Sequence, residues 1–347
     1  MKKLVAFVLL LIFACLPLSL FGCKQSTPTP KTELFYFYFG TESAITEYEG
    51  LSDSEFERMC YIVEDELSRY HSLLDIYYSY SGVTNLKDVN EAGGKTTAVS
   101  AQLCDFLLYA KDMYEKTAGR VNIAMGSVLS LWHDEREAAK KPGAVAKLPD
   151  QAALSEAAKH TDINNLIIDR EECTVTLADP NMRLDVGALG KGYVAKRITD
   201  RLVASGFSSF ILNLGGNISA VGTKSGGERF AAGIKNPSPT SSLDRNVARL
   251  ELFNKSLSTS GDYENFYTVE GVRYHHIIDP DTQMPSAYGY RSVTILGADP
   301  SITDALSTAL FTVSVERGRA IAESLCVSVF WLHADGRIEY TDGFTFI

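Results

Sequence analysis

The chain has 347 residues, a formal net charge of −10 at pH 7 and 45% hydrophobic residues, which is the composition of a protein with a large buried core. The acidic balance, without a basic patch that carries interleaved aromatic residues, argues against nucleic-acid binding. The length exceeds the roughly 250 to 300 residues at which one core usually stops growing, so one large domain and two closely joined lobes are both possible. The cysteines show no C-x-x-C spacing, which argues against zinc binding and thiol redox chemistry.

The first residues have the pattern of a lipoprotein signal peptide. Two lysines precede an apolar run at residues 4–21, and Gly22 then precedes Cys23. This pattern predicts cleavage before Cys23 and attachment of lipid, including palmitate, to that cysteine. The alternative is a membrane-spanning helix, because the run is near the lower length limit for one. Pro17 and the polar tract after Cys23 favour cleavage.

Residues 24–31 are rich in proline and threonine, a composition typical of an extended tether. We therefore predict a signal peptide at residues 1–22, a tether at 23–32 and a folded domain at 33–347. Lipid on Cys23 would hold this domain at the extracytoplasmic face of the cell membrane.

The first half of the domain alternates between strand and helix patterns. Aromatic and β-branched residues at 33–48 predict one or two strands, and Ser52-x-x-Glu55 is a capping box that begins a helix. The tyrosine-rich stretch 71–90 is predicted to be a loop, and the next helix to run from about 100 to 118. The segments that follow are an apolar loop at 119–132, an exposed connection at 134–149, a short helix near 150–160 and strands at 166–168 and 174–177.

A glycine-rich turn then connects a short strand to an amphipathic helix. The strand ends at Asp185, and Gly187, Gly190 and Gly192 follow. Glycines let a backbone approach a phosphate, and the free N–H groups of a helix N-terminus favour an anion, to which Lys191 adds a positive charge. The order G-x-x-G-x-G is neither the dinucleotide fingerprint nor a Walker loop. The alternative is a turn that only packs the helix onto a sheet.

The second half of the domain is dominated by strand patterns. A polar loop is expected at 256–262, a helix begins at Ser301, and a hairpin across Asp335-Gly336 ends the chain. Antiparallel connections with grouped helices predict an α+β fold rather than a doubly wound sheet. The expected strands lie at 210–214, 217–221, 230–234, 247–253, 266–269, 272–278 and 291–296.

Two groups of polar residues could carry chemistry. Asp304 and Thr308 lie four residues apart on the late helix, so they share a face, and with a backbone carbonyl they would suit magnesium. Alternatively, Asp304 caps its helix within Ser301-x-x-Asp304. His276 ends a strand beside Asp279, where a histidine held by an acid can act as a general base. A histidine satisfied inside a hairpin is the other possibility.

Several separate stretches together resemble the ApbE family of flavin transferases. These stretches occur in the same order as in that family and at about the same separations. Two further stretches, FYFGTESAITEYEG and LLDIYYSYSGVTNLKDVN, resemble the family's N-terminal segments, so the resemblance covers nearly all of the mature chain. The most specific stretches are DVGALGKGYVAKR, ILNLGGNISAVG, SLSTSGDYENFY, YHHIIDPDTQMP and ITDALSTALF.

The resemblance implies antiparallel-rich mixed sheets with packed helices in a T-fold-like architecture, with the ligand site between two lobes. It implies a protein that binds FAD and Mg²⁺ and transfers the FMN moiety of FAD to a threonine or serine hydroxyl of an acceptor protein, with release of AMP. Some members instead hydrolyse FAD to FMN and AMP, and a non-catalytic flavin-binding lipoprotein is a third possibility.

The resemblance also implies roles for individual residues. The metal ligands would be Asp304, Thr308 and the backbone carbonyl of Ala188, and His276, with Asp279, would supply the catalytic base. The residues that correspond to FAD contacts are Phe39, Tyr77, Asn122, Asp185, Lys191 and Ile277.

Three positions depart from the family's usual pattern. Phe39 stands where methionine is common, Asn122 where aspartate is common, and Gln283 where glycine usually follows the D-P-x-T turn. None of these is a proposed metal ligand, so the departures leave the expected activity in place.

Overall fold

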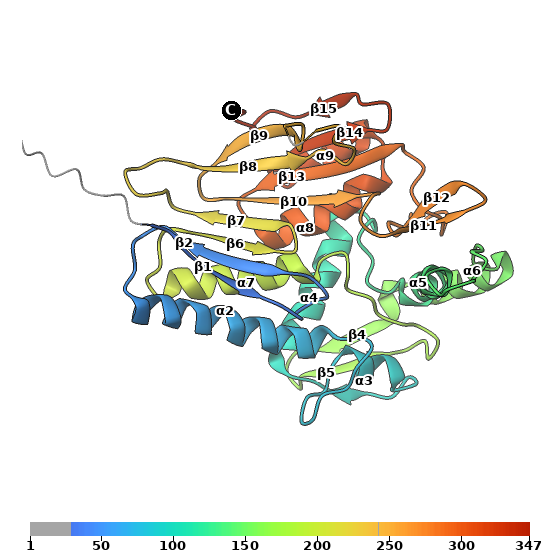
Figure 1. Cartoon of the computed structure of the whole chain (residues 1–347). Helices are drawn as coiled ribbons and strands as arrows, with labels where there is room; N and C mark the ends of the chain where they lie inside the picture. The colour runs from blue at the N-terminus through green and yellow to red at the C-terminus, as the bar shows by residue number, and fades with distance from the viewer. Residues whose placement is uncertain (1–28, 242) are drawn as a thin grey trace, which may run out of the picture.

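The computed structural model describes residues 29–241 and 243–347. Its central element is an eight-stranded sheet with the order β1-β2-β6-β7-β10-β13-β14-β15, in which neighbouring strands are antiparallel (Figure 1). Its strands are β1 (Lys31–Phe35), β2 (Ser43–Glu47), β6 (Phe210–Leu214), β7 (Asn217–Val221), β10 (Lys255–Gly261), β13 (Tyr290–Gly297), β14 (Ser328–His333) and β15 (Ile338–Tyr340).

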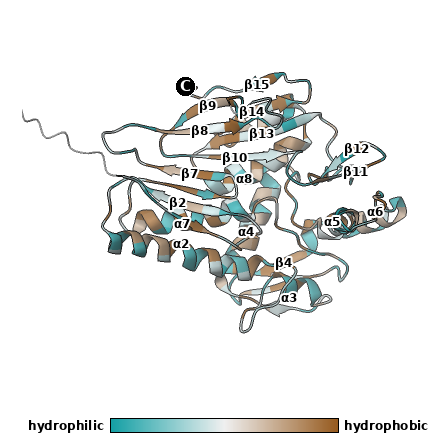
Figure 2. Ribbon diagram, viewed as in Figure 1, coloured by the Kyte–Doolittle hydropathy of each residue, from teal (hydrophilic) through white to brown (hydrophobic). Residues whose placement is uncertain are grey.

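Helices cover one face of this sheet. α2 (Asp53–Leu74) begins with the expected capping box at Ser52 and lies beside α7 (Gly190–Ala204), which in turn packs against α8 (Pro300–Ala309). α4 (Ala101–Lys116) packs against α7 and α8 from behind. Apolar side chains of these helices and of the sheet form the main core, and Figure 2 shows the alternation of hydrophobic and hydrophilic residues along α2 that this packing requires.

The opposite face of the sheet is covered by a β-hairpin. β8 (Phe230–Lys235) pairs with β9 (Asn246–Leu252), and the inward side chains of this hairpin pack on Leu257, Leu296 and Phe330 of the sheet. Because both faces are covered, the central strand β13 is buried along nearly its whole length.

Two smaller units complete the fold. One is a three-stranded sheet of β3 (Thr97–Ala98), β5 (Thr174–Leu177) and β4 (Leu166–Asp169) beside α3 (Leu86–Glu91). The other joins the hairpin of β11 (Phe266–Val269) and β12 (Val272–His275) to α5 (Gly126–Ala139) and α6 (Gln151–Ala157) through a separate apolar cluster. The remaining elements are α9 (Val315–Ser324) and the 3-10 turns η1 (Ala158–His160), η2 (Ile163–Asn165) and η3 (Leu310–Thr312).

The α+β class with antiparallel sheets is confirmed, but four stretches predicted to be loops or connections contain a helix or a strand. The polar stretch 256–262 belongs to the central strand β10, because its buried hydroxyls find partners on neighbouring elements. The Ser258 hydroxyl, for example, bonds that of Thr303 on α8 at 2.9 Å. The apolar loop expected at 119–132 and the exposed connection expected at 134–149 contain α5, whose Val128 and Trp132 pack in the separate apolar cluster with β11. The loop expected at 71–90 contains α3.

The N-terminal predictions are only partly within the described residues. The signal peptide and the lipidation site Cys23 lie outside them. β1 begins at Lys31, inside the stretch predicted to be a tether, because Lys31 pairs with Glu47 across the hairpin and its ammonium group bonds Asp53. Across residues 29–241 and 243–347, the model contains no helix with the length and apolarity needed to span a bilayer.

Candidate functional site

Asp304 lies at the junction of α7 and α8. Its side chain is buried, and its Oδ2 accepts a hydrogen bond from the backbone N–H of Gly192 at 2.6 Å. A Cβ atom at Gly192 would overlap Asp304, so glycine is what allows the two helices to meet here. The capping alternative for Asp304 is wrong, because the N-cap of α8 is Asp299 and Asp304 lies inside the helix.

The same contact leaves the Ala188 carbonyl oxygen available. At the start of a helix, the N–H of Gly192 would ordinarily bond to the carbonyl four residues earlier, which is that of Ala188. It donates to Asp304 instead, and no donor within residues 29–241 and 243–347 bonds to the Ala188 carbonyl. The N–H of Gly192 therefore bonds to the buried Asp304 carboxylate and leaves the Ala188 carbonyl free.

Thr308 lies one helical turn beyond Asp304 on α8. Its hydroxyl lies 3.2 Å from the Ser260 hydroxyl at the end of β10, and its side chain is half-buried. Burial raises the pKa of the Asp304 carboxyl, an effect that the positive charge of Lys191 and the Gly192 N–H oppose. A positive charge close to a buried carboxylate favours its charged form, and a bound cation would act in the same direction as Lys191.

The donor chemistry fits magnesium. One carboxylate, one hydroxyl and one free backbone carbonyl are hard oxygen donors, and Mg²⁺ commonly completes its shell with water and substrate phosphates. The described residues contain no cluster of three or more His, Cys, Asp or Glu side chains suited to a metal ion.

Asp185 and Lys191 flank the glycine turn. Asp185 accepts from the N–H of Gly187 at 2.9 Å, and its own N–H donates to the Ile123 carbonyl at 2.8 Å. Burial raises the pKa of Asp185, opposed by the Gly187 N–H and the charges of His133 and Arg136. Lys191 is close enough to act electrostatically on both Asp304 and His276.

His276 has one ring nitrogen held and one free. Its Nδ1 lies 3.1 Å from the Asn265 carbonyl, which can only accept, so Nδ1 carries the hydrogen of the neutral ring and Nε2 carries a lone pair. The residue reaches solvent, but the protein packed around the ring desolvates it. This desolvation lowers the pKa of His276 to about 4, with smaller contributions from Arg136 and Lys191. The ring is therefore a neutral acceptor at neutral pH.

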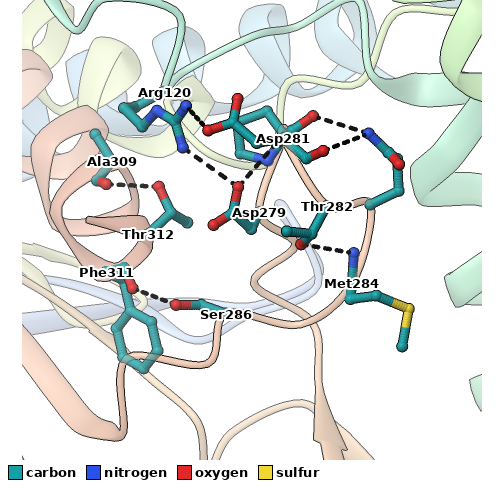
Figure 3. Close-up of polar contacts among 11 residues, drawn as sticks. Arg120, Asp279, Asp281, Thr282, Met284, Ser286, Ala309, Phe311 and Thr312 are labelled. Atoms are coloured by element: carbon teal, nitrogen blue, oxygen red, sulfur yellow. Dashed lines mark hydrogen bonds and ion pairs between the residues drawn. The ribbon is translucent and has the colours of Figure 1, made fainter. Parts of the chain in front are cut away.

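Asp279 does not hold His276, and that expectation is wrong. Its carboxylate is buried and pairs with Nη1 of Arg120 at 3.3 Å, and it also accepts from the N–H of Asp281. Figure 3 shows the Arg120 guanidinium directed at both Asp279 and Asp281. The Ser286 hydroxyl donates a hydrogen bond to the Phe311 carbonyl at 2.6 Å, which fixes the end of this turn. Asp279 therefore fixes the turn that follows His276.

Replacement of Arg120 by methionine is expected to destabilise the fold by about 3 kcal/mol, because it leaves the buried Asp279 carboxylate without its counter-ion. Chemical denaturation measures the change. The control is Arg170→Met, which removes an exposed arginine paired with Asp105 and is expected to change stability by less than about 1 kcal/mol. Equal stability of Arg120→Met and the wild type would contradict the role given to the pair.

Phe39 and Tyr77 are the two aromatic residues that correspond to FAD contacts in the family. Phe39 is half-buried, its ring lies edge-on to that of His71 at 5.5 Å, and Thr41 beside it is packed tightly against Gly215. Tyr77 is 55% exposed, and its ring lies close enough to Asp185 for that charge to contribute to a raised pKa, of which burial is the main cause. An exposed aromatic ring beside this polar cluster suits stacking on a flat ligand.

Asn122 and Ile277 are committed to internal contacts. The Asn122 side chain donates to the Thr161 carbonyl at 2.8 Å and accepts from the Ala124 N–H at 2.9 Å. Ile277 is buried in the main core, with its N–H bonded to His275 and its carbonyl to Ser286. The structure thus places these two residues behind the site surface.

Two residues of α5 near the site, His133 and Arg136, were not predicted from the sequence. The His133 ring lies 5.5 Å from the Tyr77 ring, and Nη2 of Arg136 lies 3.1 Å from His133 Nδ1. The charge of Arg136 also acts on Asp185 and His276. The signal was present, because buried residues four apart at Val128 and Trp132 have helical spacing, and Arg136 continues the same helix face one turn further on.

The cluster combines groups from two parts of the fold. α7 and α8 under the large sheet supply the oxygens and Lys191, and the unit of α5 with β11 and β12 supplies His133 and Arg136 and precedes His276. A separate depression of about 400 Å³ near the end of α2, lined by Arg69, Ser72 and Thr84 among others, contains none of these groups.

These observations define an α+β protein with a metal-type oxygen set beside cations and a neutral histidine, an arrangement suited to phosphate-ester chemistry. A model of the ApbE family matches residues 39–331, and the chain therefore belongs to the ApbE family.

Two relatives and one solved structure illustrate the family match. The chain is 33% identical over 267 residues to a FAD:protein FMN transferase of Treponema pallidum (strain Nichols), covering 73% of this chain and 71% of the relative. It is 28% identical to one of Vibrio cholerae, covering 94% and 92%. The fold is similar to the crystal structure of the ApbE protein of Thermotoga maritima, with a TM-score of 0.78, 24% identity and coverage of 90% and 97%.

Proposed function

We propose that this protein is a magnesium-dependent FAD:protein FMN transferase, which moves the FMN moiety of FAD onto a threonine or serine hydroxyl of an acceptor protein and releases AMP. The observation that carries the proposal is the Gly192 contact, which connects the buried Asp304 carboxylate to the turn with the free Ala188 carbonyl. The name of the curated relatives supports the same activity.

Asp304, Thr308 and the Ala188 carbonyl would hold the metal ion. When bound, Mg²⁺ supplies neutralisation of charge on the two phosphoryl groups of FAD. Lys191, at the start of α7, adds a fixed positive charge beside the same groups, and Phe39 and Tyr77 would contact the flavin ring. Asn122, Asp185 and Ile277 complete the proposed surroundings of FAD, with Asn122 and Ile277 acting through the packing of the residues in front of them.

His276 is the proposed general base. Its free Nε2 would take the proton of the acceptor hydroxyl as the hydroxyl oxygen forms its bond to the FMN phosphorus. The bond from that phosphorus to the bridging oxygen breaks, and AMP leaves with the bonding electron pair. Asp279 supports this step indirectly, because its pairing with Arg120 holds the turn after His276.

The location proposed for the enzyme is the extracytoplasmic face of the cell membrane, through lipid on Cys23. The signal-peptide pattern of residues 1–22 and the proline-rich stretch after it support this placement. A covalent phosphoester would keep the flavin on an extracytoplasmic acceptor, where free flavin would diffuse away.

The proposal is tested with purified protein, FAD, MgCl₂ and an acceptor protein that exposes a threonine. The expected result is a flavin-fluorescent acceptor band under denaturing conditions, with release of AMP. FMN and AMP formed without acceptor would instead indicate a FAD pyrophosphatase. Bound flavin without any turnover would indicate a non-catalytic flavin-binding lipoprotein, and either of these outcomes in place of the labelled acceptor would contradict the proposal.

A further inference from the structure

His71, Tyr80 and Asp75 form a continuous hydrogen-bonded chain at the C-terminal end of α2. The Tyr80 hydroxyl donates to Oδ2 of Asp75 at 2.8 Å and lies 3.3 Å from Nε2 of His71. The backbone N–H of Phe39 lies 3.3 Å from Nδ1 of His71. A backbone N–H can only donate, so Nδ1 is the acceptor and the neutral ring carries its hydrogen on Nε2. His71 therefore donates to Tyr80, and Tyr80 to Asp75.

Each end of this chain fixes the backbone of an aromatic residue. At one end Phe39 has a left-handed backbone, with a φ of 53°, which a bulky side chain adopts only where its surroundings impose it. The bond to His71 and the edge-on contact between the two rings are such surroundings. At the other end, Oδ1 of Asp75 accepts from the backbone N–H of Tyr77 at 2.7 Å.

We propose that His71, Tyr80 and Asp75 are positioning residues that set the Phe39 and Tyr77 rings for the flavin ring of FAD. This inference rests on the proposed function. His71 and Asp75 bond to the backbone of the two aromatic residues, Tyr80 joins His71 to Asp75, and none of the three bonds to Asp304, Thr308 or Lys191. They should therefore affect the binding of the flavin half of FAD and leave the binding of the nucleotide half unchanged.

Tyr80→Phe removes only the hydroxyl that joins His71 to Asp75. The dissociation constants of FAD, FMN and ADP for the purified full chain are measured by calorimetry. The constants for FAD and FMN are expected to rise about tenfold, as for the loss of a hydrogen bond to a charged partner, and that for ADP to stay unchanged. The matched control is Tyr78→Phe, because Tyr78 is 71% exposed and its hydroxyl bonds to no described residue, so all three constants should stay unchanged.

Asp75→Asn is a second variant for the same test. Its amide oxygen can still accept from the Tyr77 N–H but loses the charge that strengthens the bond from Tyr80, so the rise for FAD and FMN should be smaller. Thermal unfolding of each variant shows whether the fold is kept.

Two results would overturn the inference. One is unchanged affinity for FAD and FMN in both variants, and the other is an equal loss of affinity for ADP, which would show a general disturbance of the site. A wild-type protein that binds no FAD would contradict the proposed function itself. Wild-type binding that the variants do not alter would contradict only the positioning role.

Discussion

Replacement of Asp304 by asparagine is expected to lower the rate of FMN transfer by roughly a thousandfold or more, because a bound metal ion supplies several kcal/mol of transition-state stabilisation. The amide has the shape of the carboxylate, and its oxygen can still accept from the Gly192 N–H that joins α7 to α8. The variant therefore removes the negative charge of the proposed ligand set and keeps the packing around it.

The fold of metal-free Asp304→Asn is expected to be at least as stable as that of the wild type. Burial raises the pKa of Asp304, which means that the charged carboxylate is disfavoured in the folded protein, and a neutral amide removes that penalty. Loss of activity with an unchanged or higher free energy of unfolding would separate loss of metal from loss of fold.

The matched control is Asp299→Asn on the same helix. Asp299 caps α8 by accepting from the Ser301 N–H, and asparagine caps a helix about equally well. Transfer rates at saturating Mg²⁺ are therefore expected to stay near the wild-type value. Wild-type transfer by Asp304→Asn under the same conditions would refute the metal-binding role of Asp304.

Replacement of His276 by glutamine is expected to reduce transfer by about 10² to 10⁴-fold, the usual contribution of a general base. The loss should appear mainly in kcat, since the ring's free Nε2 acts on the acceptor hydroxyl rather than on bound FAD. The control is His275→Gln, which changes the neighbouring imidazole that lies near Ser286 and leaves His276 in place. A transfer rate within a few-fold of wild type for His276→Gln would exclude this residue as the base.

The pH dependence of the wild type provides a second test of His276. Desolvation lowers the pKa of this ring, so it stays neutral and able to accept a proton through the range in which an ordinary histidine, with a pKa of about 6.5, becomes charged. The acidic fall in kcat/KM should therefore lie well below pH 6.5 and be absent from His276→Gln. A fall centred near the ordinary histidine pKa would show that the ring is not desolvated in the working enzyme.

The features predicted correctly from the sequence are those that are caused by residues close together in it. The capping box at Ser52 begins α2, and the glycine-rich stretch leads into α7 as predicted, with Gly192 allowing the close contact to Asp304 of α8. These features depend on residues near one another in the sequence, or on the absence of a side chain, and both can be recognised from the residues alone.

Other features depend on partners far away in the sequence, and these could not be predicted. Ser258 looks like a loop residue until Thr303 satisfies its buried hydroxyl, which makes β10 a central strand. Asp279 was expected beside His276, but its partner is Arg120, which precedes it by 159 positions. The resemblance to a family located the candidate site, whereas the hydrogen-bond partners that give each residue its function required the folded chain.

The most direct test of the account is the anomalous diffraction of Mn²⁺ in crystals of the protein grown with FAD, since Mn²⁺ accepts the same oxygen ligands as Mg²⁺. If the metal binds as proposed, one strong peak is expected within coordinating distance of the Asp304 carboxylate, the Thr308 hydroxyl and the Ala188 carbonyl, in contact with the phosphates of FAD. A metal peak elsewhere in the molecule, or bound FAD with no metal between its phosphates and α8, would contradict it.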